Sequence, residues 1–144
     1  MEHRETERAL FRALHRFGKV NTGQIIEMEG LTQGEFFGLF MLREHLKAHP
    51  EGMHVRELAQ CTRVSTPGAS RMLRAMEEKG LIERRIDRND RRNTYIFLTE
   101  QGEEAWNRTA ARLSTFLDRV VDRMGLENVQ IMIDLWNQFS DILE

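Results

Sequence analysis

Basic side chains and short hydroxyl side chains gather in one stretch of the sequence, between residues 63 and 92. That stretch holds nine basic and five acidic residues, a formal charge of +4, whereas the whole chain carries −2. Most of these basic residues are arginines, and the planar guanidinium group matches the geometry of phosphate and of the guanine edge. A basic stretch on an otherwise acidic chain predicts one surface aimed at a polyanion, with double-stranded DNA as the expected partner.

Catalytic chemistry has no comparable pattern in this sequence. It contains no glycine-rich phosphate loop, no His-Glu-x-x-His, no Gly-x-Ser-x-Gly and no Cys-x-x-Cys. Motifs of this kind place a phosphate cradle, a metal or a nucleophile where the reaction needs it. We therefore expect a protein that is not an enzyme, has no cofactor and holds no metal.

Two sensor chemistries remain as alternatives. Cys61 is the single cysteine, and we expect a buried structural thiol because free cysteines are usually packed. His45 and His49 are four residues apart and could share one helix face, as a metal pair requires. No further ligand can be assigned to them, so we interpret both as surface histidines. A thiol-responsive or metal-responsive protein stays as the alternative.

Length and composition indicate one folded domain. The chain has 144 residues, of which 40% are apolar and 31% are charged, a balance typical of globular proteins. No run of about 18 apolar residues is present, and the charged start MEHRETERAL lacks the apolar core of a signal peptide. We therefore expect no membrane partner and a cytoplasmic location.

Apolar spacing and capping residues predict a mainly helical chain. Thr32 and Glu35 form a capping box, and Ser65 is an N-cap with Pro67 in the first turn of its helix. Gly80 ends that helix. A loop or short helix is expected over residues 21–30. Helices are predicted over residues 5–19, 32–48, 65–79, 100–124 and 128–143, with a short helix carrying Val55, Leu58 and Ala59, and strands over residues 81–86 and 94–98.

Two short helices around a tight turn, followed by a β-hairpin, make a winged helix-turn-helix. The predicted fold class is mainly α with a small β-hairpin wing. Residues 31–99 are the expected DNA-binding region, and residues 1–30 and 100–144 the helical dimerisation region, in a single compact domain without a linker. The apolar stripes of the terminal helices exceed what a small winged domain can cover, which predicts a homodimer.

Four motifs follow one another in this chain: HVRELA from His54, STPGASRMLRAMEEKGLIERR from Ser65, DRNDRR from Asp87 and LTEQG from Leu98. In this order and spacing they resemble the MarR family of transcriptional regulators, over nearly the whole length of the chain. The resemblance implies an obligate homodimer with two winged domains on a palindromic operator. It also implies that a small-molecule or redox signal often controls DNA binding.

The helix over residues 65–79 would then be the recognition helix. A helix N-terminus in the major groove offers backbone N–H groups to phosphate and short side chains to base edges. We expect Arg71 or Ser70 to contact bases and Arg74 to contact a phosphate or a base; the alternative is an ordinary helix with solvated arginines. The predicted DNA-contacting residues of this helix are Ser65, Thr66, Ala69, Ser70, Arg71 and Arg74.

The loop between the two predicted strands would be the tip of the wing. Arginines on an extended loop suit a narrow minor groove, and Asp90 would hold Arg92 or Arg88 by a charge-assisted hydrogen bond. The family often has arginine where this chain has Asn89, so either Arg91, which we favour, or Arg88 would enter the groove. A solvated hairpin tip is the alternative. The predicted wing contacts are Arg88, Asp90, Arg91 and Arg92.

The sequence therefore predicts a sequence-specific DNA-binding regulator, a repressor that occupies a palindromic operator as a homodimer and that a small-molecule effector releases. Phe36, Phe40, Met41 and Trp106 could line an effector pocket, although such a stripe belongs more often to the core. The alternative from another class is a winged-helix module that docks on protein. Protein-docking surfaces are less charged and more aromatic at their centre than this stretch.

Overall fold

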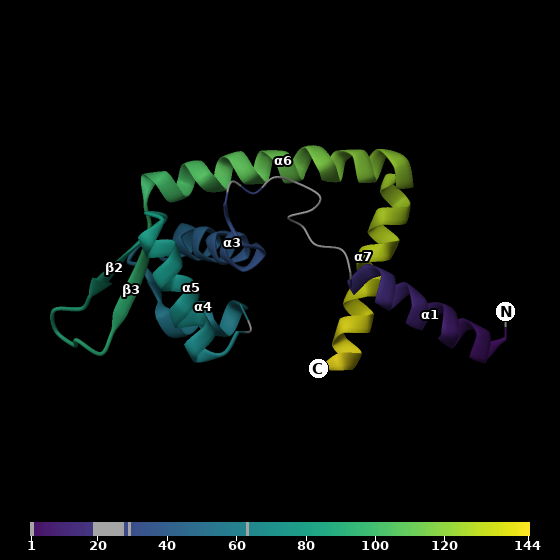
Figure 1. Cartoon of the computed structure of the whole chain (residues 1–144), viewed down its shortest axis with the longest axis horizontal. Coiled ribbons are helices and arrows are strands. Elements are labelled where there is room, and N and C mark those ends of the chain that lie inside the picture. Colours follow the sequence, from purple (N-terminus) through teal and green to yellow (C-terminus); the bar gives the residue numbers. More distant parts are fainter. Residues whose placement is uncertain (1, 19–27, 29, 63) are drawn as a thin grey trace. The chain divides into compact units, whose positions relative to one another are not determined.

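The computed structural model describes residues 2–18, 28, 30–62 and 64–144 of the chain. Most of these residues are helical, and one small antiparallel sheet completes the fold (Figure 1), which confirms the predicted fold class. The segment predicted as a loop or short helix over residues 21–30 lies largely outside the described residues. The elements are α1 (His3–Gly18), α3 (Gln33–Ala48), β1 (Met53–His54), α4 (Val55–Thr62), α5 (Thr66–Glu78), β2 (Ile82–Ile86), β3 (Thr94–Leu98), α6 (Glu100–Met124) and α7 (Leu126–Leu143).

The chain groups into two compact units, Met1–Thr109 and Ala110–Glu144. The first unit contains the sheet, α3, α4, α5 and the first part of α6, and the second contains the rest of α6 and α7. The boundary therefore falls inside one long helix, and the sequence carries no proline or glycine at that point. Among the described helices, none combines the length and the apolar character needed to span a bilayer.

Helix boundaries follow the capping residues. Thr32 Oγ1 accepts a hydrogen bond from the backbone N–H of Glu35 at 3.1 Å, and the Glu35 carboxylate accepts one from Thr32 N–H at 3.4 Å. This is the predicted capping box of α3. Ser65 Oγ caps α5 by accepting from Gly68 N–H at 3.1 Å. Gly80, with φ of +74°, ends the same helix in the left-handed conformation that glycine adopts without strain.

The sheet has the strand order β1-β3-β2, and both pairs are antiparallel. β2 and β3 form the predicted wing hairpin, with Ile82 opposite Leu98 and Ile86 opposite Thr94. The third strand, β1, was not predicted. It is only two residues long, so it carries no alternation of apolar and polar side chains that a sequence pattern could reveal.

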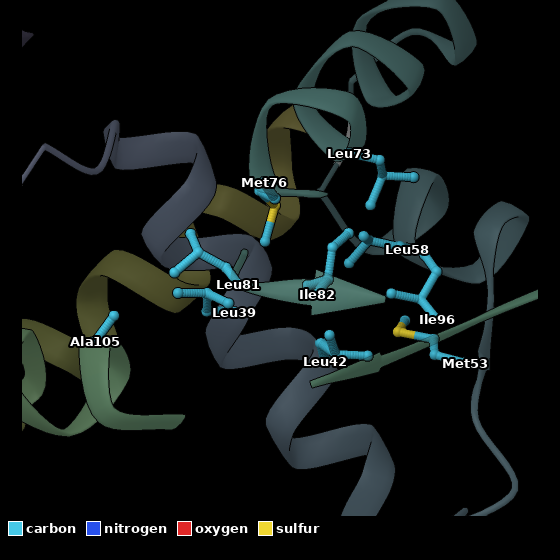
Figure 2. Packing of buried hydrophobic residues seen from close by; sticks show 10 residues of the cluster. All are labelled: Leu39, Leu42, Met53, Leu58, Leu73, Met76, Leu81, Ile82, Ile96 and Ala105. Carbon is cyan, nitrogen blue, oxygen red and sulfur yellow. The ribbon is translucent and has the colours of Figure 1, made fainter. Parts of the chain in front are cut away.

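One hydrophobic core holds the winged region together. Figure 2 shows apolar side chains from α3, α4, α5 and the sheet converging on a common centre. Leu39, Leu58, Leu73 and Ile96 are each 0% exposed, and they come from four different elements. The position of α5 is therefore fixed by burial of its inner face. The cluster comprises Leu39, Leu42, Met53, Leu58, Leu73, Met76, Leu81, Ile82, Ile96 and Ala105.

The start of α6 is fastened to the base of the wing. Thr99 Oγ1 accepts from Gly102 N–H at 2.9 Å and donates to the carbonyl of Gly80 at 2.6 Å. A Cβ atom on Gly102 would collide with the Leu81 carbonyl oxygen, so only glycine permits this close approach. The long helix thus starts from the same junction that connects α5 to β2.

Candidate nucleic-acid interface

Helix α5 divides its residues between the core and solvent. Leu73 and Met76 are 0% exposed and pack in the core. Ser70, Arg71 and Arg74 are exposed, as are Ser65 and Thr66 at the start of the helix. This arrangement leaves short hydroxyl side chains and two arginines on the free side of α5. It is the arrangement a recognition helix needs, since the N-terminal residues of such a helix meet the bases.

Ala69 is not part of that free side. It was predicted among the DNA-contacting residues, and this prediction is wrong, because Ala69 is only 1% exposed and packs in the core. The physical reason is helical periodicity: Ala69 lies four residues before Leu73 and seven before Met76, and these spacings place all three on one face. Its small side chain allows α5 to approach its neighbours closely.

Half of the described basic residues between positions 64 and 92 form ion pairs with carboxylates of the same chain. The ion pairs are Lys79–Glu35 at 2.8 Å, Arg84–Glu77 at 3.0 Å, Arg85–Glu83 and Arg92–Asp90 at 3.6 Å. The Arg85 guanidinium also lies over the Phe97 ring, 4.1 Å from its centroid. Of these pairs, Lys79–Glu35 connects the end of α5 to α3, and Arg84–Glu77 connects β2 to α5.

Four arginines of the same stretch have no carboxylate partner within the described part of the chain: Arg71, Arg74, Arg88 and Arg91. All four are exposed, two on α5 and two on the wing loop. An unpaired guanidinium group keeps its charge and its full set of donors available to a ligand. The positive charge that the sequence spreads over the whole stretch is thereby concentrated on two short segments.

The wing loop is shaped by its aspartates. Asp87 Oδ1 accepts from the backbone N–H of Asn89 at 2.9 Å, and Asp90 Oδ1 accepts from the backbone N–H of Arg92 at 3.0 Å. Such Asx turns fix a tight loop without any regular structure. Asp90 also contacts the Arg92 side chain, as predicted, but at 3.6 Å and on an exposed surface this ion pair is weak. The main contribution of Asp90 is to the backbone of the tip.

A buried carboxylate fastens the far end of α5, and no sequence pattern predicts this contact. The Glu35 side chain is 4% exposed, and the Lys79 ammonium donates to its two oxygens at 2.9 and 2.8 Å. The same ammonium donates to the Gly30 carbonyl at 2.9 Å. Lys79 lies 44 residues from Glu35, so no local spacing links them. Lys79 is therefore engaged with α3 and not directed at a ligand.

Cys61 is exposed, so the prediction of a buried thiol is wrong. Leu58, at 0% exposure, enters the core from the middle of α4, whereas Cys61 lies in the last turn of that helix. Thr62, which follows Cys61, turns its hydroxyl back to the Leu58 carbonyl at 2.8 Å. The end of α4 therefore leaves the thiol at the surface, beside the turn of the helix-turn-helix.

The histidine pair is held by carboxylates. The His45 and His49 rings stack with centroids 4.7 Å apart, while His45 lies 3.5 Å from Glu57 and His49 lies 3.1 Å from Glu51. A backbone hydrogen bond and then His49 lower the pKa of Glu51. No three His, Cys, Asp or Glu side chains gather around a common metal position in the described residues.

The aromatic side chains considered for an effector pocket pack on one another. Trp106 stacks on Phe36 with centroids 4.9 Å apart and lies 5.7 Å from the Phe40 ring. Arg43 lies over the same indole, 5.8 Å from its centroid, and pairs with Glu103 at 3.0 Å. Phe36 is 8% exposed. This stack joins α3 to the first part of α6.

The winged region is similar to known bacterial proteins that are named as regulators. Residues 44–93 match the model of the MarR family. The transcriptional regulator Hpr of Bacillus pumilus is 30% identical over 95 residues, 65% of this chain and 43% of that protein. The homoprotocatechuate degradative operon repressor of Escherichia coli is 27% identical over 92 residues, 64% of this chain and 62% of that protein. The chain thus spans about half the length of the curated relatives it matches.

Solved structures extend the similarity beyond the winged region. The S. aureus MepR–DNA complex is 25% identical, with a TM-score of 0.72, and the match covers 93% of this chain and 96% of that one. MepR bound to ethidium bromide matches with a TM-score of 0.57 at 25% identity, covering 94% and 95%. The matched segment is therefore similar to the MarR family, and the observed fold is similar to that of these solved structures.

Proposed function

We propose that the protein is a sequence-specific DNA-binding repressor that binds a palindromic operator as a homodimer. The observation that carries this proposal is the distribution of charge: the arginines without carboxylate partners lie on the free side of α5 and on the wing loop. Helix α5 would enter the major groove and the wing loop the adjacent minor groove. The proposed contacts are Ser65, Thr66, Ser70, Arg71, Arg74, Arg88, Arg91 and Arg92, with Asp90 shaping the loop.

Exposed apolar side chains on α7 support the homodimer. Its 18 residues include no buried position, although the helix carries Ile131, Leu135 and Trp136. An apolar surface of this extent on a single helix marks an association site. Because a dimer with twofold symmetry buries the same patch on both copies, the terminal helices would pair and present two recognition helices one DNA turn apart.

Relatives support the repressor role and an effector. One relative is an operon repressor, and MepR has been solved with DNA and with ethidium bromide. We propose that this chain acts in the cytoplasm and that a small molecule releases it from DNA. Such a ligand needs only to favour one separation of the two recognition helices over another.

The test is a selection of duplexes from a random-sequence pool, followed by anisotropy titration of the recovered duplex at several salt concentrations. If the four arginines without carboxylate partners each contact a phosphate in both protomers, these eight contacts give a slope of about −7 for log K against log salt. Competitor-resistant binding to a palindrome by a dimer is the expected result. Failure to enrich any duplex, or binding that random-sequence DNA abolishes, would favour the protein-docking module.

A further inference from the structure

A polar notch of about 360 Å³ lies between α4 and the base of the wing. Its walls come from the end of β1, from the exposed side of α4 and from the start of β3. These elements are brought together by the pairing of β1 with β3, in which His54 lies opposite Tyr95. The lining residues are His54, Arg56, Glu57, Gln60, Asn93 and Tyr95.

His54 is fixed in one orientation at the floor of this notch. The backbone N–H of Arg56 donates to His54 Nδ1 at 3.1 Å, so Nδ1 acts as an acceptor and the proton of the neutral ring is on Nε2. Nε2 then donates to Asn93 Oδ1, at 3.4 Å. The edge of the same ring meets Tyr95, with centroids 5.8 Å apart. Because Asn93 accepts through its oxygen, its NH₂ group is left to donate into the notch.

Donors therefore dominate the notch. Within the described residues, the Arg56 guanidinium, the Gln60 amide and the Tyr95 hydroxyl have no hydrogen-bond or ion-pair partner. Glu57 is the one carboxylate, and it lies 3.5 Å from His45 Nε2 on α3. One guanidinium and one carboxylate leave the notch without net charge. Such a site suits a singly charged group held by directional hydrogen bonds.

We propose that this notch binds a phosphodiester group of the DNA backbone, with Arg56 supplying the charge and Gln60, Asn93 and Tyr95 supplying further donors. The inference rests on the proposed function. If α5 lies in the major groove and the wing tip in the adjacent minor groove, one sugar-phosphate backbone separates them and passes the junction of the helix-turn-helix with the wing. The first helix of such a motif crosses the backbone, and here that helix is α4.

The notch would fix the register of the protein on the duplex, while α5 reads the bases. A free phosphate dianion would fit it less well, because the single guanidinium of Arg56 can balance only one of its two negative charges. Inorganic phosphate added at constant ionic strength should therefore leave the bound duplex in place. Displacement of the duplex by phosphate would reassign the notch to small anions and overturn the proposal.

The experiment compares Arg56→Gln with Lys47→Gln, which removes the same charge from an exposed position of the winged region. We expect Arg56→Gln to weaken binding of the selected duplex about tenfold and to lower the salt slope by about one unit per protomer. Tyr95→Phe should weaken binding a few-fold, and Glu57→Gln should strengthen it. Lys47→Gln should change neither affinity nor slope by a comparable amount.

Phosphate ethylation of the duplex locates the contact. Ethylation of one phosphate per half-site should interfere with binding of the wild-type protein and lose its effect with Arg56→Gln. The proposal that the notch binds a phosphodiester would be overturned if Arg56→Gln matched Lys47→Gln in affinity, salt slope and interference pattern. Arg91→Ala, measured in parallel, separates the proposed DNA-binding function from the proposed phosphate site. If the salt slope falls for Arg91→Ala but not for Arg56→Gln, only the phosphate site in the notch is refuted. If the wild-type protein selects no duplex, the proposed function fails and the notch fails with it.

Discussion

Replacement of Lys79 by methionine would test whether the far end of the recognition helix is held by its buried ion pair. Methionine keeps the length of the side chain and removes its charge. Glu35, at 4% side-chain exposure, would lose both hydrogen bonds from the ammonium and keep only the 3.4 Å bond from Thr32 N–H. The Gly30 carbonyl would lose its bond as well. The variant would therefore leave a buried charge almost without compensation.

The size of the effect follows from the burial of the two partners. Removing one member of a buried ion pair costs about 3 to 5 kcal/mol. The Lys79 side chain is 40% exposed, so water can reach the site after the substitution and the cost is lower. We expect a loss of about 2 to 3 kcal/mol in the free energy of unfolding, or roughly 6 to 12 °C in Tm for a chain of this size.

Thermal and urea unfolding at one fixed protein concentration would measure this loss, since a dimer couples stability to concentration. Lys47→Met is the matched control, because Lys47 forms an exposed pair with Glu44 at 2.9 Å that contributes at most about 0.5 kcal/mol. The double variant Lys79→Met/Glu35→Met should recover most of the stability, except for the capping-box bond of Glu35. A Tm of Lys79→Met equal to that of Lys47→Met would refute the argument.

DNA binding adds a second readout for Lys79. Its ammonium is engaged with α3, so Lys79→Met should leave the salt slope of DNA binding at the wild-type value, whereas loss of a phosphate contact would lower it. A lower slope for Lys79→Met would show that the ion pair opens when DNA binds.

The remaining predictions concern the DNA face, the core and the thiol. Arg91→Ala should lower the salt slope by about one unit per protomer, and an unchanged slope would place Arg91 off the DNA. Arg71→Ala should relax base preference at one operator position, by about 1 to 3 kcal/mol in discrimination, which selection with the variant would reveal. Ala69→Val should overpack the core and cost about 1 to 3 kcal/mol in urea unfolding, whereas a surface alanine would tolerate the change. Cys61→Ser should leave stability and DNA binding unaltered, with or without peroxide, and a response to peroxide that the variant lacks would promote the thiol sensor.

Local sequence signals predicted most of the helix and strand boundaries. Ser65, Thr32 and Gly80 act on groups within a few residues, so their effect can be read without knowledge of the fold. The same is true of residues 94–98, whose aromatic and β-branched side chains favour a strand, and the observed β3 has those bounds. Whether a segment forms a helix or a strand therefore depends here on residues within that segment or next to it.

The residues that remain available on the candidate nucleic-acid interface were harder to predict from the sequence. The sequence shows which basic residues exist, but Lys79 and Arg84 pair with carboxylates on other elements, and those positions depend on packing. Glu35 and Lys79 are 44 residues apart and belong to different helices, so no spacing rule connects them. The burial of Ala69 follows from its spacing to Leu73 and Met76 and is therefore a sequence signal, whereas the exposure of Cys61 depends on how α4 packs.

The helical character, the hairpin wing and the stretch that carries the positive charge can be predicted without a structure, because they depend on propensity, capping and composition over short distances. Which arginines remain unpaired, which side of α5 is free and which donors meet in the notch beside the wing depend on how the chain folds. Ion pairing and burial join residues far apart in the chain, and their geometry exists only after the core has packed.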